Sequence, residues 1–204
     1  MGCRNFFDLN SGNLTKCKEL QKESGTTLVD WETQSASEFS PGAVGDDEFL
    51  YQQIVDPNHI DPTERKLKPT AFQDSANKGM STNRESHISW EALVDRGRLR
   101  AAEYNRANPE RPPRALWGFA RFQTAAIRRI VAGEGVVRHY FVYDTANEDD
   151  PSHADVCQGV AGNKLVERSI RAALFDLAKD SLIQLDADTQ LNDELMTASL
   201  REAA

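Results

Sequence analysis

The segment Ser152-His153-Ala154-Asp155 combines a hydroxyl, an imidazole and a carboxylate within four residues. Imidazole changes its charge near neutral pH, and alternate residues of a strand point to the same side. Asp155 can therefore orient the His153 ring or face a ligand together with it. We predict His153, Asp155 and Ser152 as catalytic candidates. The competing interpretation is a turn at Pro151 and Ser152, with His153 only packing or hydrogen-bonding where the strand begins.

A second group of candidates lies around a run of arginines. Residues 96–138 contain ten Arg and no Lys, with a net charge of +7. Guanidinium groups bind carboxylates and phosphates through two parallel hydrogen bonds, which suits specific ligand contacts. Arg138, the adjacent His139 and Tyr51 are the predicted ligand-binding residues. The alternatives are a solvated helix face together with internal pairing to the acidic ends of the chain and, for His139, a core or cross-strand role beside Phe141.

Other patterns that carry chemistry are weak in this sequence. His139, His153 and Asp155 could form an open ligand set of two His and one carboxylate, but nothing in their spacing requires it, so we expect no metal site. The sequence has no Gly-x-Ser-x-Gly motif and no glycine-rich phosphate loop followed by Lys-Ser or Lys-Thr. We expect no cofactor, and we interpret Cys157 as a small hydrophobic residue.

Charge and composition exclude several classes of protein. The chain has 204 residues, a net charge of −8 and a mean hydropathy of −0.59, and no stretch approaches the roughly 18 apolar residues of a membrane-spanning helix. The net charge is −5 over residues 1–48, +4 over residues 49–145 and −7 over residues 146–204. Acidic ends repel a polyanion, so nucleic acid is a disfavoured partner and a protein the expected one. Three widely spaced cysteines indicate a reduced, cytoplasmic protein without a disulfide framework.

The order of the expected elements predicts an α+β fold. Strands are expected at 48–55, 115–120, 136–143 and 154–160, where β-branched and aromatic residues gather between turn signals. Helices are expected at 90–107, with Ser89 as N-cap, at 124–132, with Thr124 as N-cap, and from 163 to about 179. Residues 58–86 contain few apolar residues and read largely as a loop. This order favours a single mixed sheet covered by helices.

The distribution of apolar residues predicts one core domain at 47–180. Residues 1–46 contain only short apolar pairs among polar residues, so we expect a poorly ordered N-terminal extension. Residues 181–204 form a C-terminal tail in which Leu185, Leu191, Leu195 and Leu200 give a weakly amphipathic pattern. That tail is expected either to be poorly ordered or to form a docking helix.

Four short segments stand out along the middle of the chain: residues 49–54, Ala71-Phe72, Gly79-Met80-Ser81 and residues 150–154. In their order and rough spacing they resemble a group of small uncharacterised bacterial proteins. In that group the corresponding segments read approximately Leu-Tyr-Arg-x-Ile, Ala-Phe, Leu-Ser-Val and Pro-Ser-His-Ala. This chain departs from the pattern at Gln52, where the group has Arg, and at Thr82, where it has Val. A function that needed the Arg would lose its charge and bidentate geometry here, and the resemblance implies no activity.

Two classes of function follow from these observations. The first is a non-catalytic protein that works through a protein partner, as an accessory component of a bacterial gene cluster; charge segregation and the lack of a complete catalytic motif favour it. The second is an enzyme acting on a phosphate-bearing substrate, with Arg residues binding the anion and His153 as acid or base. The enzyme requires His153 in a cleft with an arginine and a carboxylate nearby.

Overall fold

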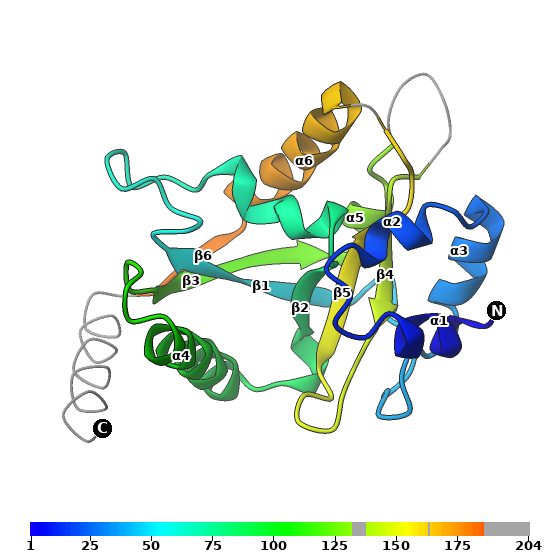
Figure 1. The fold of residues 1–204 in the computed structure, drawn as a ribbon, viewed down its shortest axis with the longest axis horizontal. Coiled ribbons are helices and arrows are strands. Elements are labelled where there is room, and N and C mark those ends of the chain that lie inside the picture. Colours follow the sequence, from blue (N-terminus) through cyan, green and yellow to red (C-terminus); the bar gives the residue numbers. More distant parts are fainter. Residues whose placement is uncertain (132–137, 163, 186–204) are drawn as a thin grey trace.

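The structure, a computed structural model, describes residues 1–131, 138–162 and 164–185. Within these residues six α-helices and two 3₁₀ helices surround one sheet, which is the predicted α+β class (Figure 1). The helices are α1 (Cys3–Leu9), α2 (Lys16–Leu20), α3 (Gly25–Glu32), η1 (Pro69–Ala76), η2 (Glu85–His87), α4 (Trp90–Ala107), α5 (Thr124–Arg128) and α6 (Lys164–Lys179). The strands are β1 (Phe49–Asp56), β2 (Met80–Arg84), β3 (Ala115–Gln123), β4 (Tyr140–Asp144), β5 (His153–Gln158) and β6 (Leu182–Gln184).

The sheet has the order β4-β5-β2-β1-β3-β6, and all five pairings are antiparallel. A single sheet was expected, but the expectation of mixed strand directions is wrong. Parallel neighbours need a long crossover connection, whereas β4 and β5 are joined by the short loop 145–152 and so run in opposite directions.

One strand, β2, lies in a region that the sequence predicts to be largely loop. It pairs with β1 on one side and with β5 on the other, so it is central to the sheet. Its sequence, Met80-Ser-Thr-Asn-Arg84, has only one large apolar residue. Met80 and Thr82 are buried, and the polar residues between and beyond them are held by neighbouring strands and loops. Tertiary contacts therefore stabilise a strand that apolar alternation does not reveal.

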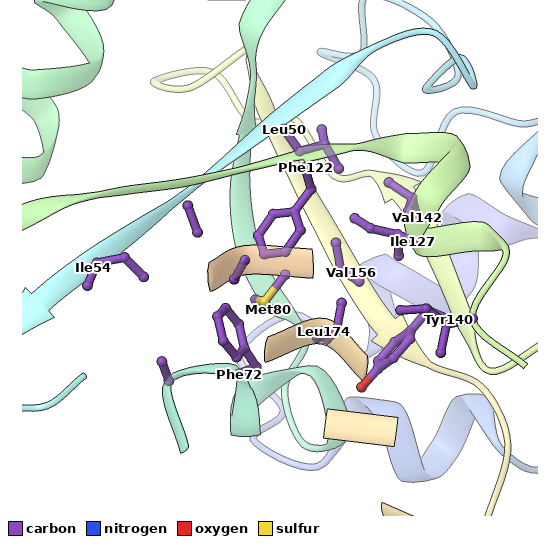
Figure 2. Packing of buried hydrophobic residues seen from close by; sticks show 14 of the residues in the cluster. Leu50, Ile54, Phe72, Met80, Phe122, Ile127, Tyr140, Val142, Val156 and Leu174 are labelled. Atoms are coloured by element: carbon purple, nitrogen blue, oxygen red, sulfur yellow. The ribbon is translucent and has the colours of Figure 1, made fainter. Parts of the chain in front are cut away.

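The first face of the sheet carries the larger core (Figure 2). Leu50, Ile54, Phe122 and Val156 extend from the strands toward α6, α5 and η1. Phe72 of η1 meets Phe122 edge-on, with ring centroids 5.9 Å apart. Because apolar side chains alternate along these strands, the intervening residues lie on the second face.

The second face is covered by two separate groups of helices. Over β1 and β3, α4 packs Leu93 and Val94 against Tyr51 and Phe119. Over β4 and β5, the helices α1, α2 and α3 pack Phe6, Phe7, Cys17, Leu20, Leu28 and Trp31 against Phe141, Tyr143 and Cys157. The surface of β2 and the first half of β5 lies between these two covers (Figure 1).

The expectation of a poorly ordered N-terminal extension at 1–46 is therefore wrong. These residues form three short helices whose apolar pairs are completed by β4 and β5. Glu32 of α3 also binds the outer edge of the sheet: its carboxylate accepts a hydrogen bond from the Val142 amide and pairs with Arg128 and Arg138. A carboxylate held against an edge strand blocks further strand pairing there. Short apolar pairs suffice because the sheet supplies the partner surface.

Most of the arginines between 96 and 138 pair within the protein, which was the alternative interpretation of that run. Arg96 and Arg100 bind Asp150, and Arg121 forms two hydrogen bonds with Glu85. Arg98 pairs with Asp95, Arg114 stacks on the Tyr104 ring, and Arg128 and Arg138 share Glu32. Folding therefore places carboxylates beside most of these arginines and offsets part of their positive charge.

Two helix starts test the capping predictions. Ser89 caps α4, because its hydroxyl accepts a hydrogen bond from the Ala92 amide at 3.2 Å. Thr124 was expected to cap the following helix, but it is the first helical residue of α5, with Gln123 at the N-cap position. The strand β3 extends to Gln123 and sets this boundary.

The C-terminal part of the described chain adds an edge strand. β6 pairs with β3, and the carbonyl oxygen of Ile183 lies so close to Gly118 that a Cβ there would be 2.2 Å away. Leu185 is buried against the α4 cluster. The expected tail 181–204 thus begins inside the fold, and its remainder, 186–204, lies outside the described residues. In the described part of the chain, no helix has the length and apolar character needed to cross a membrane.

Candidate functional site around Ser81 and His153

Four polar side chains from β2 and β5 gather on the second face of the sheet. The antiparallel register places Ser81 opposite Asp155 and Asn83 opposite His153. Directly paired residues point to the same face, and residues two apart do so as well. Met80 and Ala154, the neighbours of these residues in sequence, belong to the core of the opposite face. The sheet therefore brings Ser81, His153 and Asp155 into one polar patch between the two helical covers.

Both nitrogens of the His153 ring have hydrogen-bond partners. Its Nδ1 atom lies 3.1 Å from the Thr145 carbonyl oxygen and 2.9 Å from the Thr145 hydroxyl. Its Nε2 atom is hydrogen-bonded to the Ser81 hydroxyl. We assign the ring proton to Nδ1, because the Thr145 carbonyl oxygen can only accept a hydrogen bond, and Nε2 is then the acceptor for the Ser81 proton. This is the tautomer that a general base requires.

Asp155 is held by a lysine from the N-terminal segment rather than by His153. The Nζ atom of Lys16 lies 2.5 Å from Asp155 Oδ2, and the Lys16 side chain is 13% exposed and the Asp155 side chain 7%. The nearer distance between Asp155 and the ring, from Oδ1 to Nε2, is 3.9 Å, which is beyond a hydrogen bond. Burial acts to lower the pKa of Lys16, but the Asp155 carboxylate outweighs it and the pKa is raised. Lys16 is therefore charged at neutral pH.

A cavity of about 220 Å³, lined mostly by residues with polar side chains, opens beside these groups. Its wall combines the loop between α1 and α2 with the start of β2 and of β5. Lys16 and Lys78 supply positive charge, and Ser81 stands exposed at its edge. The lining residues are Asn10, Gly12, Asn13, Leu14, Lys16, Lys78, Gly79, Ser81, His153 and Asp155.

Gly79 closes the floor of the cavity in a conformation suited to glycine. Its φ angle is +92°, a region that L side chains rarely adopt. A Cβ at this position would lie 3.0 Å from Asp155 Cγ and 3.1 Å from Cys157 Sγ. The backbone thus approaches β5 closely just before Ser81, and this approach helps to fix where Ser81 points.

Ser152, a predicted catalytic candidate, does not face the cavity. Its side chain is buried, and its hydroxyl donates to Asp150 Oδ1 at 2.7 Å and accepts from Asn83 Nδ2 at 2.8 Å. Asp150 is in turn bound by Arg96 and Arg100 of α4. Ser152 therefore belongs to a polar network that anchors the loop before β5. The turn expected at this point is consistent with that role.

Tyr51 lies in the same cross-strand row as His153 but serves another contact. It pairs with Asn83, which pairs with His153. The Tyr51 hydroxyl donates to Glu85, and its ring packs edge-on against Phe119 at 6.1 Å. Burial and the Glu85 carboxylate raise the pKa of Tyr51. The structure gives Tyr51 a packing role beneath α4, away from the lining of the cavity.

Arg138 and His139 lie at the opposite end of β5, near Gly159 rather than near His153. Arg138 lines a separate cavity of about 840 Å³ with Phe141, Val29 and other residues of α3, but its guanidinium is already bound to Glu32 and to the Tyr140 carbonyl oxygen. His139 is 3% exposed, and within the described part of the chain neither ring nitrogen has a hydrogen-bond partner. Burial lowers the pKa of His139, which favours the neutral ring. Its place in the core agrees with the alternative interpretation of this residue.

The metal set considered from the sequence is not assembled in this fold. His139 and His153 are separated by the length of β5. Among residues 1–131, 138–162 and 164–185, no three His, Cys, Asp or Glu side chains gather in a way that could hold a metal ion.

Sequence reasoning missed four residues of the site. Ser81 lies on the unrecognised strand β2, Lys16 comes from the segment expected to be poorly ordered, Lys78 lies in the region expected to be a loop, and Thr145 holds His153 through its backbone. The one available signal was the Gly79-Met80-Ser81 segment of the resemblance, which places a serine in a shared motif.

Comparisons with protein-family models, curated proteins and solved structures find no match to this chain.

Proposed function

We propose that this protein binds a small phosphate-bearing molecule in the cavity beside Ser81 and acts on it by acid–base chemistry at His153. The observation that carries the proposal is the orientation of the His153 ring. Thr145 fixes Nδ1, and Nε2 points to the Ser81 hydroxyl at the edge of the cavity. A base within hydrogen-bond reach of a hydroxyl is the geometric requirement for proton abstraction.

The charge of the lining supports an anionic ligand. The lining contains two lysines, Lys16 and Lys78, and one carboxylate, Asp155, so these three side chains together carry a net positive charge. Lys16 is committed to Asp155 in a mostly buried ion pair. Lys78 pairs with Asp74 at 3.3 Å, but both side chains are about half exposed, and such surface pairs contribute little. Lys78 can therefore turn to a phosphate at small cost.

The dimensions of the cavity limit the ligand. A volume of about 220 Å³ is below the range of roughly 300–1,000 Å³ typical of drug-sized ligands. A phosphate group with a small organic substituent fits this volume better than a long polymer. The arginines that were expected to bind the anion lie elsewhere, so lysines take that role in the proposal.

The resemblance to the group of bacterial proteins fits the same site. Two of its segments, residues 79–81 and residues 150–154, come together through the pairing of β2 with β5 and contribute Ser81 and His153. A shared binding site would explain why these short motifs, distant in sequence, recur together. Gln52, where the group has Arg, donates to the Ala71 carbonyl oxygen at 2.9 Å on the opposite face of the sheet.

Calorimetric titration of the full chain with phenyl phosphate, carried out in the His153→Gln background so that hydrolysis of the ester is slow, tests the binding part of the proposal. Lys78→Ala should weaken binding about tenfold, which corresponds to about 1.4 kcal/mol. Lys66→Ala is the matched control, because Lys66 is also an exposed lysine paired with a nearby acid, Glu64, and lies outside the cavity. It should leave the affinity unchanged within twofold, a bound of about 0.4 kcal/mol.

Release of inorganic phosphate from small phosphate monoesters tests the catalytic part. His153→Gln should lower the rate at least about 100-fold, the lower range for loss of a general base. Binding without any turnover would instead favour the other class, a cytoplasmic, non-catalytic accessory protein with a protein partner. The internal pairing of the arginines leaves nucleic acid disfavoured in either case.

A further inference from the structure

Ser81 differs from the other serines that make hydrogen bonds near the site. Its side chain is exposed at the edge of the cavity, while its hydroxyl is bound to His153 Nε2. Ser152, which does not line the cavity, is buried and bound to Asp150. Ser75 is buried and donates to the Phe72 carbonyl oxygen. Ser81 thus combines access from solvent with a neighbouring base.

The surroundings of the pair restrict its motion. The antiparallel pairing of β2 with β5 fixes the two backbones relative to each other, and Thr145 holds the far side of the His153 ring. The positive φ angle of Gly79 brings the chain close to Asp155 and Cys157 just before Ser81. Sites built on paired strands hold reacting groups more closely than sites on free loops.

From this geometry we infer that Ser81 is a nucleophile that carries the phosphoryl group during the reaction. The inference rests on the proposed function, because it names the covalent step at the same site. A serine hydroxyl is a weak nucleophile by itself and is activated by an adjacent general base. The bond between Ser81 and His153 supplies that arrangement.

The step balances without a further reactant. Ser81 Oγ attacks phosphorus, an O–P bond forms, and the bond from phosphorus to the leaving oxygen breaks. The Ser81 proton moves to His153 Nε2, which then donates it to the leaving oxygen. The neutral His153 ring then takes a proton from water, and the water oxygen attacks the phosphorus of the phosphoserine. Inorganic phosphate leaves, and His153 Nε2 donates the proton to Ser81 Oγ. Lys78, which lines the cavity, offsets part of the negative charge of the phosphoryl oxygens.

The reagent diisopropyl fluorophosphate tests the nucleophile directly, because it phosphorylates activated serines and releases fluoride. Full-length protein should gain one diisopropylphosphoryl group, which peptide mass spectrometry should locate on Ser81. Ser81→Ala should lose the label. Ser86→Ala is the matched control, since Ser86 is an exposed serine that donates to Glu48 rather than to a histidine. It should label at the rate of the unaltered protein.

His153→Gln separates an activated serine from one that is only accessible. Its labelling rate should fall at least about 100-fold, because a base contributes about 10²–10⁴ to such a step. Labelling on another residue, or at an unchanged rate in His153→Gln, would overturn the inference. A folded Ser81→Ala variant, checked by circular dichroism, should still bind phenyl phosphate within about threefold, a difference of about 0.7 kcal/mol.

The two proposals fail in distinguishable ways. If phenyl phosphate binds and depends on Lys78 but Ser81 is not labelled, the covalent step is wrong and the binding site stands. If Ser81 is labelled and the labelling depends on His153 but phenyl phosphate does not bind, Ser81 stands as an activated nucleophile, and both the phosphate-bearing substrate class and the phosphoryl-carrying role of Ser81 are wrong.

Discussion

The Nζ atom of Lys16 lies 2.5 Å from Oδ2 of Asp155, although 139 residues separate them in the chain. This ion pair joins α2 to β5 directly beside His153. It makes the N-terminal segment a wall of the candidate site rather than an appendage. Stability of the N-terminal cover and the geometry of the site are therefore coupled.

Lys16→Met should destabilise the protein by about 2–4 kcal/mol, because it leaves the Asp155 carboxylate buried without its cation. Lys18→Met is the control, since Lys18 is exposed on the same helix. Urea unfolding of the two variants measures the difference. Equal stability of Lys16→Met and Lys18→Met would show that the ion pair does not hold α2 to the sheet. Replacing both partners, in Lys16→Met with Asp155→Leu, should recover part of the loss.

Limited proteolysis checks the packing of the N-terminal segment. The protease-resistant fragment should retain residues 3–36, because their apolar side chains share a core cluster with Phe141 and Tyr143. A protein truncated before residue 37 would expose this face of β4 and β5 and should aggregate or lose its cooperative unfolding transition. Rapid removal of residues 1–45, leaving a stable folded remainder, would contradict the observed packing.

Much of the fold follows from local sequence, and the site mostly does not. Residues 90–107 carry their own cap and helical period, and β1 and β3 carry their own β-branched and aromatic residues, so these elements are predictable. Because alternate residues of a strand point to the same side, the sequence also places His153 and Asp155 on one face, and the register of β5 with β2 agrees. Ser81 and Lys16 reach the site only through pairing with β5 across long sequence separations. Such contacts leave no periodic pattern in the local sequence. The strand β2 also contains few apolar residues, so the alternation that usually predicts a strand is missing.

Gly79→Ala should destabilise the protein by about 2–4 kcal/mol, since it combines a positive φ angle with a contact that is too close to Asp155 and Cys157. Gly12→Ala separates the two effects: φ is +75°, but nothing lies within 4 Å of the added Cβ. That variant should lose about 1–2 kcal/mol. Thermal or urea unfolding compares them. A loss at Gly79 no larger than at Gly12 would mean that the floor of the cavity is not tightly packed.

The His59 ring should make the free energy of unfolding fall as the pH is lowered. Burial lowers its pKa from 6.5 to about 4, and its Nδ1 atom accepts a hydrogen bond from the Val55 amide, which needs the unprotonated nitrogen. Because the unfolded chain binds the proton more tightly, stability is fully present above the unfolded pKa of about 6.5 and declines as the pH falls from there toward 4. We expect a loss of about 2–3 kcal/mol from this residue between pH 7.5 and pH 4.5.

Urea unfolding between pH 7.5 and pH 4.5 measures this slope. In His59→Asn, whose side-chain oxygen can accept the same hydrogen bond, the slope should flatten. The buried His139 adds to the loss in the same direction and remains in both proteins. An unchanged slope in His59→Asn would assign the pH dependence to other groups.

Nuclear magnetic resonance of the histidine rings shows directly whether His153 belongs to a ligand site. The chain has four histidines, and His153→Gln assigns the relevant signal in protein labelled with ¹⁵N-histidine. In the free protein His153 should show the tautomer with the proton on Nδ1, and phenyl phosphate should shift its ring signals while leaving those of His139 unchanged. A His153 ring that stays unperturbed by phenyl phosphate, or a shift at His139 instead, would contradict the assignment of the site.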